Sequence, residues 1–302
     1  MEPLRGSKWH RRTIEFGRVF LVNKSLRHSG GYTSPSLGNG RIDRARIQFS
    51  HGKALGFSAS TNVSKSENHD FEYERHSGGE NLEVMLEAKN YNNFLQQLIR
   101  KFSGDATTAL DFGAGIGTFS GSLNIPPQHV HCVEPDSDAR ELLIGKGFQV
   151  HQSLSEVDTK SISYVFTLNV LEHIEDDVAI LRELFRVLEP GGQILVYVPA
   201  FALLYTSMDA HVGHHRRYRM AELVKKMNQA GFNVHKKAYA DALGFFATLA
   251  YRLVDKSEPA PLNHQVVKLY DRYLFPLSRI LSIPLCKILG KNLYLVATRP
   301  AE

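Results

Sequence analysis

The first segment whose residue types suggest chemistry is a glycine-rich loop, 110-LDFGAGIGTFS-120. Gly113, Gly115 and Gly117 lack side chains, so a ligand can approach the backbone closely. The loop follows an expected strand and is expected to open a helix, whose free N–H groups and positive dipole end would face that ligand. Its G-x-G-x-G spacing differs from the G-x-G-x-x-G of dinucleotide-binding loops. A glycine-rich turn alone indicates only a close backbone approach.

A carboxylate at the end of the next expected strand makes the interpretation more specific. Glu134 ends the run 129–134 and is followed by Pro135 and Asp136. A carboxylate at this place can accept hydrogen bonds from both hydroxyls of a ribose. The segment 168–177, LNVLEHIEDD, follows the fourth expected strand. Ligands of parallel sheets bind outside the carboxyl ends of the strands, so these loops are expected to meet around one ligand.

A second group of reactive side chains lies in the loop 205-YTSMDAHVGHHRRYR-219. In one interpretation Arg216 and Arg217 clamp a phosphate or carboxylate, and His214 or His215 serves as a general base. The residues assigned to substrate binding are then Tyr205, Asp209, His211, Arg216, Arg217 and Tyr218.

Two other interpretations of that loop stay open. It can be a solvated cap before the next helix, with its arginines paired to nearby acids. A zinc site needs three or four converging ligands, which adjacent histidines do not provide without backbone distortion, so no metal is expected. His173, in the loop after the fourth strand, is an alternative base or packs beneath a helix.

Short apolar runs and helical periods alternate around these loops. The runs that predict strands are 107–112, 129–134, 148–151, 162–168, 193–199, 232–239 and 292–299. Helical periods cover 81–102, 176–188 and 220–230. Such alternation predicts an α/β fold with a doubly wound, mostly parallel sheet and helices on both faces. The last strand is expected to be antiparallel.

The chain is unevenly charged. Its formal net charge is +5 over 302 residues, but residues 1–66 hold 12 Lys and Arg against 3 acids. Residues 1–70 also show no sustained apolar period, so we expect a disordered basic extension before a domain that spans 79–302. An Arg-rich, acid-poor start would also suit a mitochondrial transit peptide; otherwise a cytoplasmic location is expected. Cys132 and Cys286 are too few for a disulfide framework.

Residues 241–291 form a long insert before the final strand. The runs 243–254 and 266–289 are apolar with sparse cations. They predict either a helical lid over the substrate pocket or a surface that contacts a membrane peripherally.

Together these motifs resemble the class I S-adenosylmethionine-dependent methyltransferase family, a Rossmann-like fold, over roughly residues 80–240. The resemblance rests on D-F-G-A-G-I-G, V-E-P-D, N-V-L-E-H-I-E-D and L-E-P-G-G-Q-I-L-V-Y-V-P, which stand here in the family's order. The G-H-x-R-R-Y loop is similar to that of a bacterial-type subgroup associated with glycan or lipid-linked chemistry. The resemblance implies S-adenosylmethionine as cofactor, bound by Asp111, Gly113, Ala114, Gly115, Gly117, Glu134, Pro135, Asp136, Ser153, Asn169 and Leu171.

Simpler roles stay open for three of these residues: Asp111 as a turn cap, Glu134 as a solvated strand end and Asn169 as a turn residue. The resemblance predicts methyl transfer to a small-molecule or lipid-linked, anionic acceptor. The alternatives are an RNA or protein methyltransferase and a cofactor-binding module without turnover. Nucleic acid is not expected as a partner, because the basic charge lies mainly in the N-terminal segment.

Overall fold

The computed structural model describes residues 86–255 and 264–301. The predicted basic extension 1–70 lies outside the described residues. No helix among the described residues is long and apolar enough to cross a membrane.

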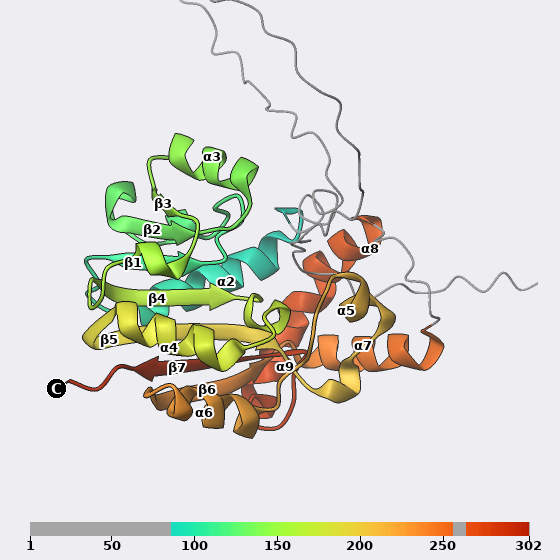
Figure 1. The fold of residues 1–302 in the computed structure, drawn as a ribbon. Helices are drawn as coiled ribbons and strands as arrows, with labels where there is room; N and C mark the ends of the chain where they lie inside the picture. The colour runs from blue at the N-terminus through green and yellow to red at the C-terminus, as the bar shows by residue number, and fades with distance from the viewer. Residues whose placement is uncertain (1–85, 256–263, 302) are drawn as a thin grey trace, which may run out of the picture. The chain divides into compact units, whose positions relative to one another are not determined.

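Seven strands form one sheet in the order β3-β2-β1-β4-β5-β7-β6 (Figure 1). Their bounds are β1 Ala109–Phe112, β2 Val130–Val133, β3 Gln149–His151, β4 Ile162–Leu168, β5 Leu188–Pro199, β6 Asn233–Ala240 and β7 Asn292–Thr298. Strands β1 to β5 pair in parallel, whereas β7 runs antiparallel to both β5 and β6. The predicted fold class, including the antiparallel last strand, is confirmed.

Helices cover both faces of the sheet. The longer ones are α2 Lys89–Phe102, α3 Ser137–Gly145, α4 Asp177–Val187, α6 Met220–Gln229, α7 Ala242–Val254 and α9 Phe275–Leu285. Apolar residues of α4 and α6 share one buried cluster with β4, β5 and β7. Residues of α2 and α9 share a second cluster with the same strands on the other side. This burial follows the helical apolar spacing read from the sequence.

Most of the described part of the insert between β6 and β7 is helical. It comprises α7, the short α8 His264–Leu269, a π-helical turn Tyr270–Leu274 and α9. In Figure 1 the short helix α5, Ser207–His211, lies with α7 beyond the carboxyl ends of the parallel strands. Two hydrogen bonds join them, from the Ser207 N–H and hydroxyl to the Asp255 carboxylate at 2.7 and 2.6 Å.

Two local expectations were wrong. The glycine loop does not open an α-helix; turns follow it, and then only the 3-10 turn Ser120–Ser122. Glycine and serine both have low helix propensity, and the Ser120 hydroxyl bonds the Asp111 carboxylate instead. The strand expected at 193–199 begins five residues earlier, since α4 ends at Val187 and β5 already begins at Leu188.

Candidate active site

The glycine loop packs its backbone against a residue that follows β4. Gly113, Gly115 and Gly117 all have positive φ, at 79°, 53° and 81°. A Cβ on Gly113 would clash with the side chain of Val170, the second residue after β4. The loop therefore needs glycine both for its conformation and for its close approach. Such a bare backbone cradle fits the cofactor that the resemblance implies.

Glu134 ties this loop to the end of β2. Its Oε2 accepts a hydrogen bond from the Gly115 N–H at 2.8 Å, and its Oε1 accepts one from the Asp136 N–H at 3.0 Å. Burial raises the pKa of Glu134, while these two backbone bonds lower it. Each carboxylate oxygen keeps a further lone pair for a ribose hydroxyl. The solvated strand end considered from the sequence is not what the structure shows, because Glu134 is buried.

Asn169 stands at the carboxyl end of β4 with a positive φ of 57°. Its side chain is fully buried, and neither its amide nitrogen nor its amide oxygen has a partner among the described residues. Leaving a buried polar group unpaired costs about 1–3 kcal/mol. The strain and the missing partners together fit a residue that faces a ligand.

Several of the other residues predicted to bind the cofactor form hydrogen bonds within the protein. Asp111 is buried and accepts a hydrogen bond from the Ser120 hydroxyl at 2.7 Å, and burial raises its pKa to about 7. Asp136 caps α3 by accepting from the Ala139 N–H. The Ser153 hydroxyl lies 2.7 Å from that of Ser155. Among the rest, Ala114 and Leu171 are buried and Pro135 is exposed.

Asp209 lies within the loop 205–219 and bonds several other residues of that loop. Its carboxylate accepts two bonds from Arg217, from Nε and Nη2 at 2.9 Å each, and lies 2.7 Å from Nδ1 of His214. Thr206 adds its N–H at 2.9 Å. Burial raises the pKa of Asp209, but the hydrogen bond from His214 and the Arg217 charge outweigh burial and hold that pKa well below its usual range. Asp209 is therefore a carboxylate that only accepts hydrogen bonds.

The arginines do not form the open clamp that the sequence predicted. Arg217 is buried in its ion pair with Asp209. Arg216 pairs with Asp177 at 3.0 Å and donates to the Glu175 carbonyl. Pairing with local acids was the second interpretation of this loop, and the positions of both arginines agree with it.

Tyr218 is corrected from an acceptor contact to a core residue. It has no exposed surface, and its hydroxyl lies 2.7 Å from Oδ2 of Asp177 and 3.0 Å from the Leu171 carbonyl. Tyr205, half-buried, donates its hydroxyl to the His214 carbonyl. His211 is exposed, as is His215, whose N–H donates to the Glu172 carbonyl.

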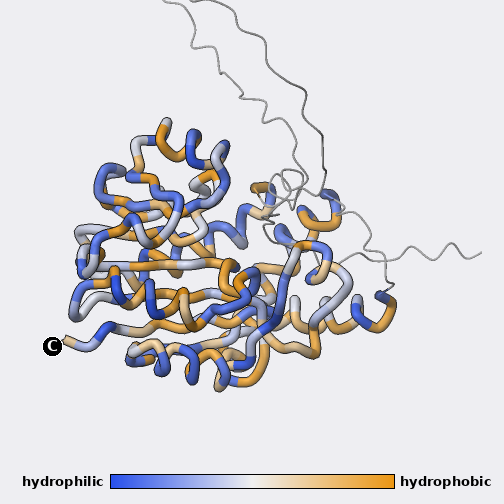
Figure 2. The backbone as a smooth tube through the Cα atoms, in the orientation of Figure 1, coloured by the Kyte–Doolittle hydropathy of each residue, from blue (hydrophilic) through white to orange (hydrophobic). Residues whose placement is uncertain are grey.

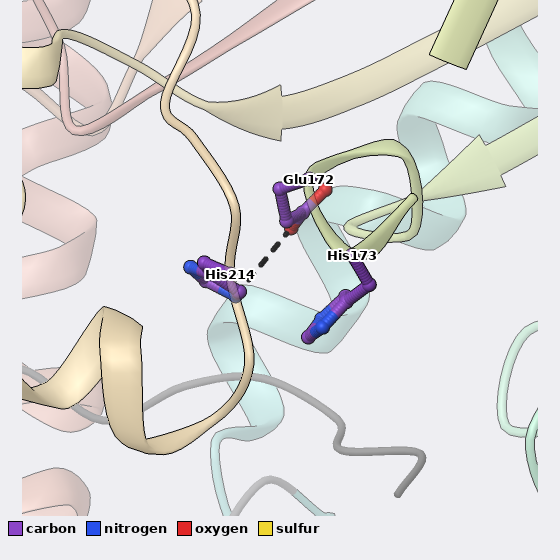
Figure 3. Close-up of side chains that lie close together, drawn as sticks. All are labelled: Glu172, His173 and His214. Carbon is purple, nitrogen blue, oxygen red and sulfur yellow. Dashed lines mark ion pairs between the residues drawn. The ribbon is translucent and has the colours of Figure 1, made fainter. Parts of the chain in front are cut away.

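The structure brings His173 and His214 together, with Glu172 between the two loops (Figure 3). The two imidazole rings meet edge to face, with centroids 4.6 Å apart. Burial lowers the pKa of His173 to about 4 and raises that of Glu172 to about 8. Our site prediction missed Glu172. Its neighbour His173 was the available signal, because both follow β4 at the edge where the ligand loops meet.

Comparison with known proteins assigns the family. The model of a family described as "Methyltransferase domain" matches residues 87–237, half of the chain. The chain belongs to this family and contains a class I S-adenosylmethionine-dependent methyltransferase domain. The predicted enzyme class and the predicted cofactor, S-adenosylmethionine, are confirmed.

Two curated relatives match shorter stretches. The chain is 34% identical over 100 residues to a probable S-adenosylmethionine-dependent methyltransferase of Mycolicibacterium smegmatis, covering 32% of this chain and 37% of that protein. It is 27% identical over 116 residues to phosphoethanolamine N-methyltransferase 2 of Caenorhabditis elegans, covering 33% and 26%. The chain thus spans little more than a third of the length of the first relative and about a quarter of that of the second.

A solved structure shares the fold. It is that of a methyltransferase from Thermotoga maritima described as a possible histamine N-methyltransferase, with a TM-score of 0.50 and 16% identity. The likeness covers 73% of this chain and 95% of that one. At this identity it supports the fold alone.

Proposed function

We propose that this methyltransferase acts on a lipid-linked acceptor presented at a membrane surface. The observation that carries the proposal is the surface of the helical insert between β6 and β7. Most of the large hydrophobic side chains exposed in the described residues lie there: Phe246, Leu253, Val254, Leu269, Tyr273, Leu274, Leu277, Ile280, Leu281, Ile283 and Ile288. Figure 2 shows the hydrophobic colouring of α7 and of the helices after it.

Basic side chains accompany this apolar surface. Arg272 and Arg279 are exposed on the same helices, and Lys287 is exposed in the turn that follows α9. Helices that combine exposed apolar residues with cations bind at the boundary of an anionic bilayer, where burial of apolar area and attraction to the headgroups add together. This surface is therefore better suited to contact with a membrane than with water.

The insert is joined to the loop at the carboxyl ends of the strands. Asp255, just after α7, binds Ser207, and Arg252 donates to the Tyr205 carbonyl at 2.7 Å. A lipid tail held on the insert would leave its polar head near this loop and near Glu172. The insert would then carry the acceptor, while the glycine loop and Glu134 hold the cofactor.

The cofactor supplies a methyl group on a sulfonium, which moves by in-line displacement. The chain's contribution is to align the acceptor with that methyl group and to keep water out, and such alignment can supply about 7–11 kcal/mol of the barrier. A base is needed only where the acceptor must lose a proton. His173 and His214 each keep one ring nitrogen without a partner among the described residues, so both side chains are available to a ligand in this site.

The test joins membrane binding to methyl transfer. The wild type is expected to sediment with vesicles of anionic phospholipid and to transfer labelled methyl from S-adenosylmethionine into the organic phase of a lipid extract. Replacing Leu253 and Ile283 together by Asp should abolish sedimentation and lower lipid labelling at least tenfold. Ile144→Asp is the control, because Ile144 is also a well-exposed large hydrophobic residue, at 62%, but lies on α3. Label found only in RNA, protein or water-soluble molecules would overturn the proposal.

A further inference from the structure

Glu172, His173 and His214 converge from two loops beyond the carboxyl ends of the strands (Figure 3). Glu172 and His173 belong to the 3-10 turn Leu171–His173 after β4, and His214 comes from the loop after α5. One ligand atom of each residue lies within 4.8 Å of the other two. Glu172 has no exposed surface, and His214 is 7% exposed.

Four polar atoms of this cluster lack a hydrogen-bond partner among the described residues. They are both carboxylate oxygens of Glu172, Nε2 of His173 and Nε2 of His214. The contact between Oε1 of Glu172 and Nε2 of His214 is 3.9 Å, which is too long for a hydrogen bond. Buried polar side chains are normally paired. Three residues with such unpaired atoms, with one ligand atom of each within 4.8 Å of the others, therefore indicate a ligand that binds between them.

Contacts on the other ring nitrogen hold both imidazole rings in place. The Asp209 carboxylate accepts from His214 Nδ1 at 2.7 Å, which leaves Nε2 as the ring nitrogen that a metal ion could bind. A backbone hydrogen bond with Gly213 holds His173, whose unpartnered nitrogen is also Nε2. Metal-bound histidines usually have such carboxylate or backbone partners on the other ring nitrogen.

We propose that Glu172, His173 and His214 bind a first-row divalent transition-metal ion of the zinc class. Two imidazoles and one carboxylate suit zinc, whereas magnesium prefers oxygen ligands alone. The Arg217 charge nearby is balanced by its two bonds to Asp209, so it does not oppose a cation.

To bind the ion, the three side chains must move slightly closer together. A tetrahedral ion with bonds of about 2.0–2.2 Å holds its donor atoms about 3.3–3.5 Å apart. Donor atoms that lie within 4.8 Å of one another reach this spacing by side-chain movements of about an ångström. Our sequence argument against a metal concerned neighbouring histidines in one loop. It does not apply here, because only one histidine of that loop takes part.

Three protein ligands leave one coordination position open, as in catalytic zinc sites. That position would take an oxygen or nitrogen atom of the methyl acceptor and orient it. This use of the site rests on the proposed function, whereas metal binding itself does not.

The experiment measures metal binding by the full chain after dialysis against a chelator. Calorimetry with Zn²⁺ should show one tight site per chain that Mg²⁺ does not fill. Co²⁺ should give the intense visible absorption of tetrahedral coordination. Glu172→Gln and His173→Gln should each weaken Zn²⁺ binding at least tenfold, while His235→Gln, on exposed β6, should bind as the wild type does.

Other outcomes would overturn the proposal. It fails if Zn²⁺ does not bind, or if both ligand variants bind as tightly as His235→Gln. Should a ligand variant lose its cooperative melting, X-ray absorption of the wild-type zinc protein decides, and sulfur ligands or coordination by histidines alone would refute the site. Labelled lipid formed equally well by chelator-treated protein would remove the metal from the reaction but leave the proposed function standing.

Discussion

Loss of the Asp209 carboxylate should destabilise the fold strongly. It holds Arg217 by two bonds, His214 by one and the start of α5 through Thr206, all in buried surroundings. The variant Asp209→Asn keeps the shape of the side chain but places an amide NH₂ against the guanidinium. Breaking a buried ion pair by removing one partner destabilises a protein by about 3–5 kcal/mol.

That loss can be measured as a melting temperature. For a domain of this size, 1 kcal/mol shifts the midpoint by about 2–4 °C, so Asp209→Asn should melt about 6–20 °C lower. Asp176→Asn is the matched control. Asp176 caps α4 at the surface by accepting from the Ala179 N–H, and asparagine caps helices equally well, so its midpoint should barely move.

The acid side of the pH profile gives an independent check. The pKa of Asp209 lies well below its usual range in the folded state, so the stability it adds is present above the unfolded pKa of about 3.9 and is lost as the pH falls further. The difference between the wild type and Asp209→Asn should therefore narrow below about pH 4. A variant within about 3 °C of the wild type at pH 7, or a constant difference down to pH 3, would refute this account.

Three further results are expected. Glu134→Gln should weaken calorimetric binding of S-adenosylmethionine about tenfold to a hundredfold, since one charge-assisted contact contributes about 1.5–3 kcal/mol; unchanged affinity would remove Glu134 from the cofactor site. Gly113→Ala should lower the melting temperature by several degrees, because its Cβ meets Val170 at positive φ, whereas Gly145→Ala, with open space around its Cβ, should not; equal midpoints would contradict this. Burial raises the pKa of Asp111 to about 7, so the stability of the wild type should decline as the pH rises from about 4 to 7. Asp111→Asn should flatten that decline in thermal melts. Melting temperatures of the wild type and the variant that fall in parallel over this pH range would argue against it.

The fold could be read from the sequence because its signals are local. Short apolar runs with helical periods between them fix a parallel sheet, and every predicted strand is present within a few residues of its expected bounds. The glycine loop and Glu134 were also predictable, because a parallel sheet brings the carboxyl ends of β1 and β2 together. The helix expected after the loop was wrong, since the low helix propensity of its glycines and serines was not weighed against the motif.

The partners of the charged side chains in the loop 205–219 were decided by tertiary structure. Sequence patterns show that Arg216 and Arg217 are charged and near one another, but not which carboxylates lie across from them; the fold supplies Asp177 and Asp209. Glu172 and His214 are far apart in the chain, and only the packing of one loop against another places their unpaired atoms 3.9 Å apart. Local periodicity determines which elements form, whereas the pairing of buried charges depends on long-range contacts that a single sequence does not reveal.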